Sequence, residues 1–349
     1  ETAYMFRVYI GKINGYSQYA TRRGFATKAK ARAALLQLQE DIESAEQSKK
    51  EITVEEIAKK WLKDYSETVQ ESTYIKTSRN FKNHIYPVFG KRKIATITPL
   101  QMQEQANEWS KKLVYGRKMK GLMNNVFKYA IRHGYIDTNP VDSVIASTRK
   151  KSDNKSDFYS KDELKKFLKL VSKTKDLEKI TLFRLLAFTG ARKGEILALE
   201  WNDWTDNTLD INKAITRGFA GEEIGNTKTV SSNRLISLDK KTKSILKKWK
   251  KQNPNTKYIF ENEFKKPIPS TLPRKWLIKI VEGSDLRPIK IHGFRHTHAS
   301  LCFDAGMTLK QVQHRLGHSD LKTTMSIYAH VTEKQRDNMA DKFAKFMAL

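Results

Sequence analysis

The first fifty residues alternate between apolar and polar side chains and then change to helical spacing. The alternation predicts a strand with one face formed by Tyr4, Phe6, Val8 and Ile10. Asn14-Gly15 favours a hairpin turn into a second strand. After Thr27, a candidate N-cap, apolar residues recur at helical spacing through Ile42. We therefore expect a small sheet with one helix.

Helical periodicity dominates the part of the chain that follows the polar stretch at 43–52. Thr53 to Glu56 has the form of a capping box, and Thr98 to Gln101 repeats it with a proline at the first helical position. From Trp109 to Ile136 the pattern predicts one helix. Its apolar stripe consists of Leu122, Val126, Phe127, Ala130 and Ile131. This part is predicted to be a helical domain.

The remainder of the chain mixes helices and short strands. Residues 147–156 contain no apolar side chain and are predicted to be a linker. Ser160 starts a capping box, and helices are expected over 161–173, over 179–189 and, beyond Gly190, to about Leu199. Strands around Leu209 and Ile236 enclose a predicted loop at 217–233, and helices follow from Asp239. The fold class is therefore multidomain and mainly α, with a mixed α+β final domain.

The net charge of the chain indicates what kind of partner it binds. Lysine and arginine number 66 against 38 acidic residues, a formal charge of +28, and the excess is present in residues 1–50, 51–150 and 151–349 alike. A polyanion that contacts the whole length is the simplest partner, and a merely soluble basic protein is the alternative. The single cysteine, Cys302, excludes an internal disulfide framework and a cysteine-cluster zinc site. Because no apolar run is long enough for a membrane span, we expect a cytoplasmic protein.

Basic side chains gather on two predicted elements. Those on or near the N-terminal strands suit a sheet laid into a DNA groove, with an ordinary solvated face as the alternative. They are Arg7, Lys12, Arg22, Arg23 and Lys28. The stretch from Trp109 to Ile136 has no carboxylate, so its polar side suits phosphate contact. Its candidate residues are Lys111, Lys112, Arg117, Lys118, Lys120 and Lys128.

Six of the eight histidines lie between residues 292 and 330, and three interpretations compete for them. A zinc site is the first, but no cysteine or acidic ligand stands at suitable spacing. The second gives core or capping roles to His296, His298 and His330 individually. The third is phosphoryl transfer without a metal, and it joins the cluster to the predicted helix start at Arg192.

Phosphoryl transfer would use residue types that are all present. Arg192 and Arg295 suit bidentate contacts with phosphate oxygens and would stabilise a pentavalent phosphorus transition state. His292 and His318 can exchange protons near neutral pH. Tyr328 supplies a hydroxyl nucleophile.

With these residues in order, the sequence resembles the tyrosine recombinases, or phage-type integrases, and is similar to those of conjugative transposons and phages. The family's boxes appear as TGARKGE with Arg192, HGFRH with His292 and Arg295, LGH with His318, and SIYAH with Tyr328. Lys228, within Thr227-Lys228-Thr229, resembles the family's β-hairpin lysine.

The resemblance implies a reaction. Tyr328 would attack the scissile phosphate of duplex DNA to give a 3′-phosphotyrosine, and Lys228 would protonate the departing 5′ oxygen. Arg192 and Arg295 would hold the phosphate. The resemblance implies no metal and no other cofactor.

Three more residues complete the implied site. His318 would hydrogen-bond the phosphate, and His292 would assist proton transfer with the tyrosine. Glu195 would fix the geometry around the first arginine, with a surface helical glutamate as the alternative.

The resemblance also implies an organisation and a function. Residues 1–48 would bind arm sites, 53–146 would be the helical core-binding domain, 147–157 the linker, and 158–349 the catalytic domain with a tail helix. The protein would integrate and excise a mobile element through a Holliday junction, as a tetramer on core and arm sites of double-stranded DNA, in a bacterial nucleoid. An excisionase or a host DNA-bending protein is a candidate further partner. The tail helix would pack on a neighbouring protomer or in cis.

Three other functions compete with this one. A chromosome- or plasmid-dimer resolvase would use the same chemistry, but resolvases usually begin at the core-binding domain. A type IB topoisomerase uses similar residues, and the arm-like N-terminal segment argues against it. A noncatalytic DNA-binding regulator would explain the charge but not the arginines, lysine and tyrosine together.

Overall fold

A computed structural model describes residues 3–13, 16–145, 157–226, 232–321, 324–325 and 347. The chain divides into two compact units, Glu1–Lys151 and Ser152–Leu349. Each unit has its own hydrophobic core. The predicted linker at 147–156 lies outside the described residues.

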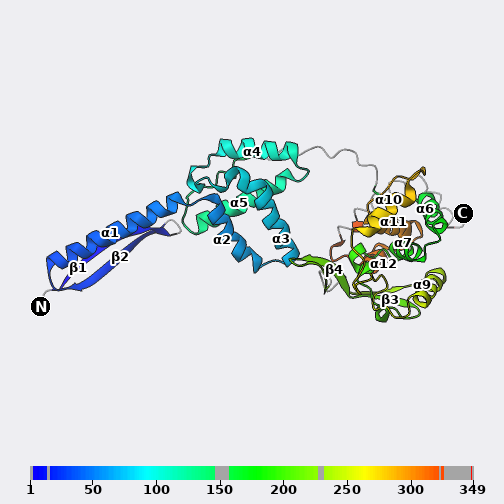
Figure 1. Cartoon of the computed structure of the whole chain (residues 1–349). Helices are drawn as coiled ribbons and strands as arrows, with labels where there is room; N and C mark the ends of the chain where they lie inside the picture. The colour runs from blue at the N-terminus through cyan, green and yellow to red at the C-terminus, as the bar shows by residue number, and fades with distance from the viewer. Residues whose placement is uncertain are drawn as a thin grey trace. The chain divides into compact units, whose positions relative to one another are not determined.

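Unit 1 begins with a two-stranded antiparallel sheet covered by a long helix (Figure 1). The strands are β1 (Tyr4–Ile13) and β2 (Tyr16–Phe25), and the helix is α1 (Lys28–Glu51). Thr27 caps the helix as predicted, because its side chain accepts from the backbone N–H of Lys30 at 3.2 Å. The predicted Asn14-Gly15 turn lies outside the described residues.

The strand and the helix both differ from their predicted extent. Register irregularities beside Tyr4 and Tyr9 break the alternation of β1, so Tyr4 and Ile10 are exposed and the predicted face holds only for Phe6 and Val8. The helix α1 continues through the polar stretch to Glu51. Glutamate, glutamine, lysine and alanine favour helix without any apolar partner, so the apolar pattern ended before the helix did.

The rest of unit 1 is helical, as predicted. Its elements are α2 (Val54–Ser66), α3 (Glu71–Asn80), the π-helix η1 (Phe81–Gly90), the 3-10 turn η2 (Ile94–Thr96), α4 (Pro99–Lys112) and α5 (Gly116–Arg132). Both predicted capping boxes are formed, at Thr53 and at Thr98. No pattern predicted the π-helix, which contains Pro87.

The single helix predicted from Trp109 to Ile136 is wrong. The chain turns at 113–115, between α4 and α5, and the two helices pack together. A Cβ at Gly116 would lie 2.4 Å from the Trp109 carbonyl oxygen, so glycine allows this close reversal. The apolar stripe on α5 is buried as predicted except for Ile131, which is 37% exposed.

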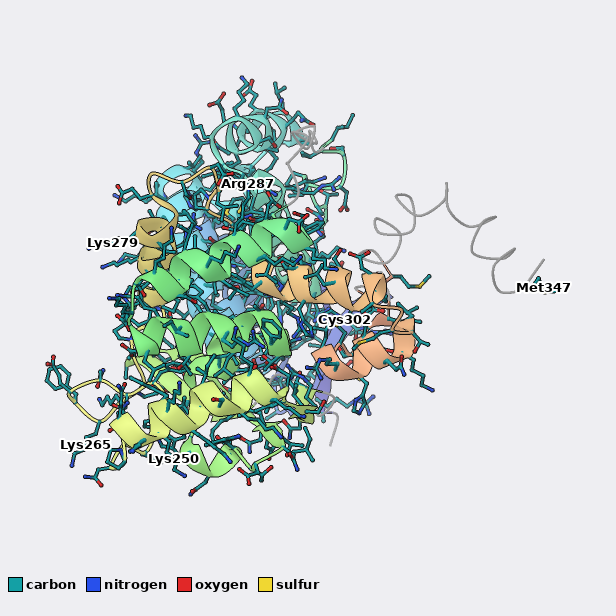
Figure 2. All side chains as sticks on the ribbon, turned by 90° about the vertical axis from the view of Figure 1, so that its right-hand side faces the viewer. Lys250, Lys265, Lys279, Arg287, Cys302 and Met347 are labelled. Atoms are coloured by element: carbon teal, nitrogen blue, oxygen red, sulfur yellow. The ribbon has the colours of Figure 1, made fainter. Side chains whose placement is uncertain are left out.

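Unit 2 contains eight regular helices or 3-10 turns and four strands among its described residues. They are α6 (Lys161–Lys173), α7 (Leu177–Thr189), α8 (Lys193–Leu197), η3 (Trp201–Asp203), β3 (Thr208–Ile211), β4 (Lys213–Gly218), β5 (Gly221–Asn226), β6 (Arg234–Ser237), α9 (Lys240–Gln252), α10 (Leu272–Val281), α11 (Gly293–Asp304) and α12 (Leu309–Leu316). Figure 2 shows α6, α7 and α9 side by side, with α11, which carries Cys302, beside them.

The strands form two antiparallel pairs, β3 with β6 and β4 with β5. The second pair corrects the loop predicted at 217–233, because β4 and β5 form a hairpin that includes residues 217–226. Gly218 pairs with Gly221 at its tip, and Gly221 has a φ of +127°. Glycines and charged residues interrupt the apolar alternation there, so the strands gave no period-two signal.

The core of unit 2 fixes the beginning of α11. Phe294 is fully buried, and its ring centroid lies 5.1 Å from that of Phe167 and 5.7 Å from that of Phe183. The first turn of α11 is therefore held by aromatic packing from α6 and α7. The neighbouring side chain, Arg295, is placed by the same packing.

Two features are absent from the described residues. No helix in the described ranges is long and apolar enough to cross a membrane. Within those ranges, no group of three or more His, Cys, Asp or Glu side chains is placed to hold a metal ion.

Replacing Phe294 with alanine should lower the free energy of unfolding of unit 2 by about 3–5 kcal/mol, because a large ring leaves a cavity in a closed core. Denaturant unfolding followed by tryptophan fluorescence measures this loss. Phe264, which is 72% exposed, supplies the control: its alanine variant should change stability by less than about 0.5 kcal/mol. Equal effects of the two substitutions would contradict the assignment of the core.

Candidate active site

The site begins at a sharp turn between two helices. Gly190 ends α7 with a φ of +66°, and a Cβ there would lie 2.6 Å from the His298 ring and 2.7 Å from Leu316. Only glycine fits both the left-handed backbone and the close packing. The turn leads directly to Arg192, which is the N-cap of α8, as the sequence predicted.

Glu195 holds Arg192 in two places. The backbone N–H of Arg192 donates to Glu195 Oε2 at 2.8 Å, and Arg192 Nη1 donates to Oε1 at 2.6 Å. Glu195 Oε2 also accepts from Arg234 Nη2 at 2.8 Å. The Glu195 and Arg234 side chains are each 2% exposed, whereas that of Arg192 is 39% exposed. The carboxylate therefore holds Arg192 from the interior, and the guanidinium stays accessible to a ligand.

The charge state of Glu195 follows from these neighbours. Burial acts to raise its pKa, but hydrogen bonds and charge from Arg234 and Arg192 outweigh burial and hold the pKa of Glu195 below its usual range. It is therefore an anion at neutral pH, and it is not the surface helical glutamate that was the alternative.

Arg295 lies in the first turn of α11 and is 2% exposed. Its Nη1 donates to the Gly190 carbonyl at 2.9 Å, and its Nη2 donates to the Leu316 carbonyl at 2.7 Å. Its Nε lies 3.3 Å from His318 Nε2. Burial, together with the charge of Arg192, lowers the pKa of Arg295 to about 9, so the side chain is still a cation at neutral pH.

His318 connects Arg295 to the segment after α12. Arg295 Nε can only donate, so His318 Nε2 must accept and Nδ1 must carry the proton. His318 Nδ1 lies 2.8 Å from Thr324 Oγ1, which is then the acceptor of that proton. Burial and the charges of Arg295 and Arg192 lower the pKa of His318 to about 3, so the ring is neutral at neutral pH.

His292 stands immediately before α11, with its ring edge-on to that of His296 at a centroid distance of 5.0 Å. Although His292 is exposed, partial burial of its ring and the charges of His296, Arg295 and Arg192 lower its pKa to about 4. Both histidines that the sequence placed in proton transfer are therefore neutral at pH 7 in this DNA-free protein.

Not every predicted residue joins this group. Lys228 and Tyr328 lie outside the described residues, as do His330 and most of the predicted tail helix. His298 is a core residue: its Nδ1 lies 2.9 Å from the Ala187 carbonyl oxygen, and its Nε2 accepts from Arg315 Nε at 3.0 Å. The group in the described part of the chain is therefore Arg192, Glu195, His292, Arg295 and His318.

Comparison with known proteins decides the family. The profile of the phage integrase family matches residues 157–335, just over half of the chain. The chain belongs to the phage integrase family. Two further profiles match before it: the N-terminal SAM-like domain of phage integrases at residues 53–110 and the Arm DNA-binding domain at residues 1–42.

Several relatives of this integrase cover most of the chain. The ICEBs1 integrase of Bacillus subtilis strain 168 is 29% identical over 277 residues, which are 74% of each chain. A tyrosine recombinase of Thermosipho africanus strain TCF52B is 30% identical over 223 residues, 63% of this chain and 72% of the relative.

Solved integrases share the fold. The Tn1549 transposon integrase in complex with transposon right end DNA has a TM-score of 0.65 at 19% identity, covering 83% of this chain and all of that one. A lambda integrase tetramer bound to a Holliday junction has a TM-score of 0.61 at 20% identity, covering 79% of this chain and 77% of that one. The predicted family, fold class and enzyme class are thereby confirmed: the chain is a tyrosine site-specific recombinase of the integrase type.

The predicted DNA-contacting side chains of the integrase's sheet occupy different faces. Arg7 is exposed and lies over the Tyr19 ring, 4.3 Å from its centroid, on the face that also carries Tyr9. Arg22 stands opposite Phe6 in the strand register and belongs to the other face of the sheet, while Arg23 and Lys28 are exposed. Lys12 lies on β1, but its side chain is outside the described part of the structure.

The basic residues predicted on α4 and α5 also differ in their surroundings. Lys111 and Lys112 end α4, and both pair with Glu108, at 3.3 and 3.1 Å. Lys120 is half-buried and donates to the Val144 carbonyl. The exposed cations on α5 from the predicted set are Arg117, Lys118 and Lys128.

The sequence assigned no role to two residues that the structure brings to the site, Arg234 and Thr324. Thr324 is fully buried and contacts His318, and Arg234 contacts Glu195. Arg234 follows shortly after Lys228 in the sequence, but a buried arginine has no periodic signature in a single sequence.

The melting temperature of the DNA-free protein should fall as the pH decreases from 6.5 to 5. An unfolded chain protonates its histidines near pH 6.5, whereas the folded pKa values of His298 and His318 are about 4 and about 3. The unfolded state therefore binds more protons in this window, and stability rises with pH. Thermal unfolding by circular dichroism measures the effect. His298→Gln should flatten the slope, and a melting temperature that rises on acidification would rule the explanation out.

Proposed function

We propose that this recombinase integrates and excises a mobile genetic element, with Tyr328 as the nucleophile that cleaves and exchanges DNA strands. The observation that carries the proposal is the convergence of Arg192, Arg295 and His318 from three separate segments. Two cations suit the binding of one phosphodiester, and the neutral imidazole of His318 lies against one of them. Membership of the integrase family supplies the reaction class.

The bond changes are those of a transesterification. The Tyr328 oxygen forms a bond to phosphorus, and the bond from phosphorus to the 5′ oxygen breaks. Lys228 gives its proton to that oxygen, and the 5′-hydroxyl of a partner strand later reverses the step. The phosphotyrosyl link conserves the bond energy, so the proposal needs neither a nucleotide cofactor nor a metal.

The described arginines divide the work of holding the phosphate. Arg192 keeps an exposed guanidinium beside Glu195 and is the first contact for a nonbridging oxygen. The three bonds of Arg295 use three of the five N–H donors of a guanidinium, so the others can reach the same phosphate. The charge of the bound phosphate raises the pKa of His318 and His292, which brings their proton exchange toward neutral pH.

The remaining parts of the chain would place the DNA. Residues 1–48 would contact arm sites and residues 53–146 the core site, joined by the linker at 147–157 to the catalytic domain at 158–349. The Arm DNA-binding profile at residues 1–42 favours mobile-element integration over a dimer resolvase. Exchange of two strands on each of two duplexes requires a tetramer on DNA. An excisionase or a DNA-bending protein would control direction.

Replacing Tyr328 with phenylalanine should abolish a denaturant-stable protein–DNA adduct, because the attacking oxygen is removed. The substrate is a recombination-site duplex nicked near the crossover, and denaturing electrophoresis detects the adduct. Tyr258→Phe, which removes a hydroxyl elsewhere in unit 2, serves as the control and should leave the adduct intact. An adduct formed by the Tyr328→Phe protein would show that another side chain attacks.

Replacing Arg192 with alanine should reduce cleavage by about 10²–10³-fold, the usual effect of removing one donor from a developing anion. Binding to the same duplex should change much less, because many other cations hold the DNA backbone. Gel shift and single-turnover cleavage on one substrate separate the two quantities. Equal losses in both would make Arg192 a DNA-binding residue only.

A further inference from the structure

A buried arginine connects three segments of the site. Arg234 is the first residue of β6, and its side chain is 2% exposed. Its Nη2 donates to Glu195 Oε2, its Nη1 to the Ser232 carbonyl and its Nε to the Arg315 carbonyl, each at 2.8 Å. Each of the three guanidinium nitrogens therefore has its own acceptor, on a different segment.

Each acceptor lies close in sequence to a residue of the proposed reaction. Glu195 holds Arg192, and Ser232 directly follows the segment 227–231 that contains Lys228. Arg315 stands three positions before His318, at the end of α12. Arg234 thus fixes α8, Ser232 and the end of α12 relative to one another.

The same contact sets the charge balance at Arg192. Glu195 is one buried anion between two guanidinium cations, so the three groups together carry one net positive charge. Without Arg234, the carboxylate would be paired with Arg192 alone and would cancel its charge. A phosphate would then meet a neutral ion pair instead of a cation.

We propose that Arg234 is a positioning residue for DNA strand cleavage, which prevents Glu195 from neutralising Arg192 and holds the three segments in register. The inference rests on the proposed function, because strand cleavage is its readout. Lysine cannot replace this arginine fully, since one ammonium cannot serve three acceptors in a fixed plane.

The experiment measures single-turnover cleavage of the nicked duplex at saturating protein, together with DNA affinity and thermal unfolding. The variants are Arg234→Gln, Glu195→Gln, the double variant and Arg234→Lys. The matched control is Arg184→Gln, which removes another buried arginine of unit 2, one that pairs with Asp239 at 2.7 Å and donates to Thr242 at 2.9 Å. Wild type and Tyr328→Phe are run beside them to report on the proposed function itself.

Arg234→Gln should cleave about 100-fold more slowly at nearly unchanged DNA affinity, the loss that a misplacement of about 1 Å can cause. The control should cleave at close to the wild-type rate. The double variant should cleave faster than Arg234→Gln alone, because removal of the carboxylate charge frees Arg192. Rescue of this kind would not follow from a structural role.

Two results would overturn the inference while leaving the proposed function intact. One is cleavage by Arg234→Gln at the wild-type rate. The other is a fold-loss of cleavage rate in the double variant equal to the product of the fold-losses of the two single variants. If Arg234→Gln does not fold, Arg234→Lys decides, and a wild-type rate in that variant would equally overturn it. If the wild-type chain forms no Tyr328-dependent adduct, the proposed function fails, and the positioning role fails with it.

Discussion

The buried carboxylate of Glu195 is the constraint on which the site depends. Desolvating a carboxylate costs several kcal/mol unless it is paired and hydrogen-bonded, and here two guanidiniums and a backbone N–H supply those partners. The need to pair this carboxylate has two structural consequences. It determines where α8 begins, since the same carboxylate closes the capping interaction at Arg192, and it requires a second arginine from a distant strand. The placement of Arg192 is thus a consequence of satisfying one anion in the interior.

Helix ends supply the other half of the scaffold. The carbonyl groups of the last turn of a helix lack internal partners and carry partial negative charge. The carbonyls of Leu316 and Arg315 at the end of α12 accept from Arg295 and Arg234, and Gly190 at the end of α7 accepts from Arg295. Two helix C-termini and one carboxylate therefore hold three cations close together. Glycines end both helices in the left-handed conformation, which turns the chain away and leaves those carbonyls open to the arginines.

Local rules explain which parts of this arrangement were predictable from sequence. Capping boxes at Thr53, Thr98 and Ser160 depend on residues three apart, and all three are formed. The break between α4 and α5 depends on tertiary packing around Gly116, and the β4–β5 hairpin depends on cross-strand pairs. Neither element therefore leaves a periodic pattern of apolar residues in the sequence. The motif residues Arg192, Arg295 and His318 come together as expected. The contacts of Arg234 and Thr324 join positions far apart in sequence or without a motif, and geometry alone reveals them.

The electrostatics of the free protein explain why the histidines do not add to the positive charge. Arg192, Arg234 and Arg295 already place three cations around one carboxylate, and a protonated imidazole would increase their repulsion. Burial, reinforced by this repulsion, lowers the pKa of His292 to about 4 and that of His318 to about 3, so both rings are neutral at neutral pH. A phosphodiester, the ligand proposed for this site, would bring negative charge. It would reduce the repulsion among the arginines and make protonation of the histidines less costly, so anion binding and proton affinity would be thermodynamically linked. Under the proposed function, the acid–base capacity of the histidines would therefore develop when the substrate binds.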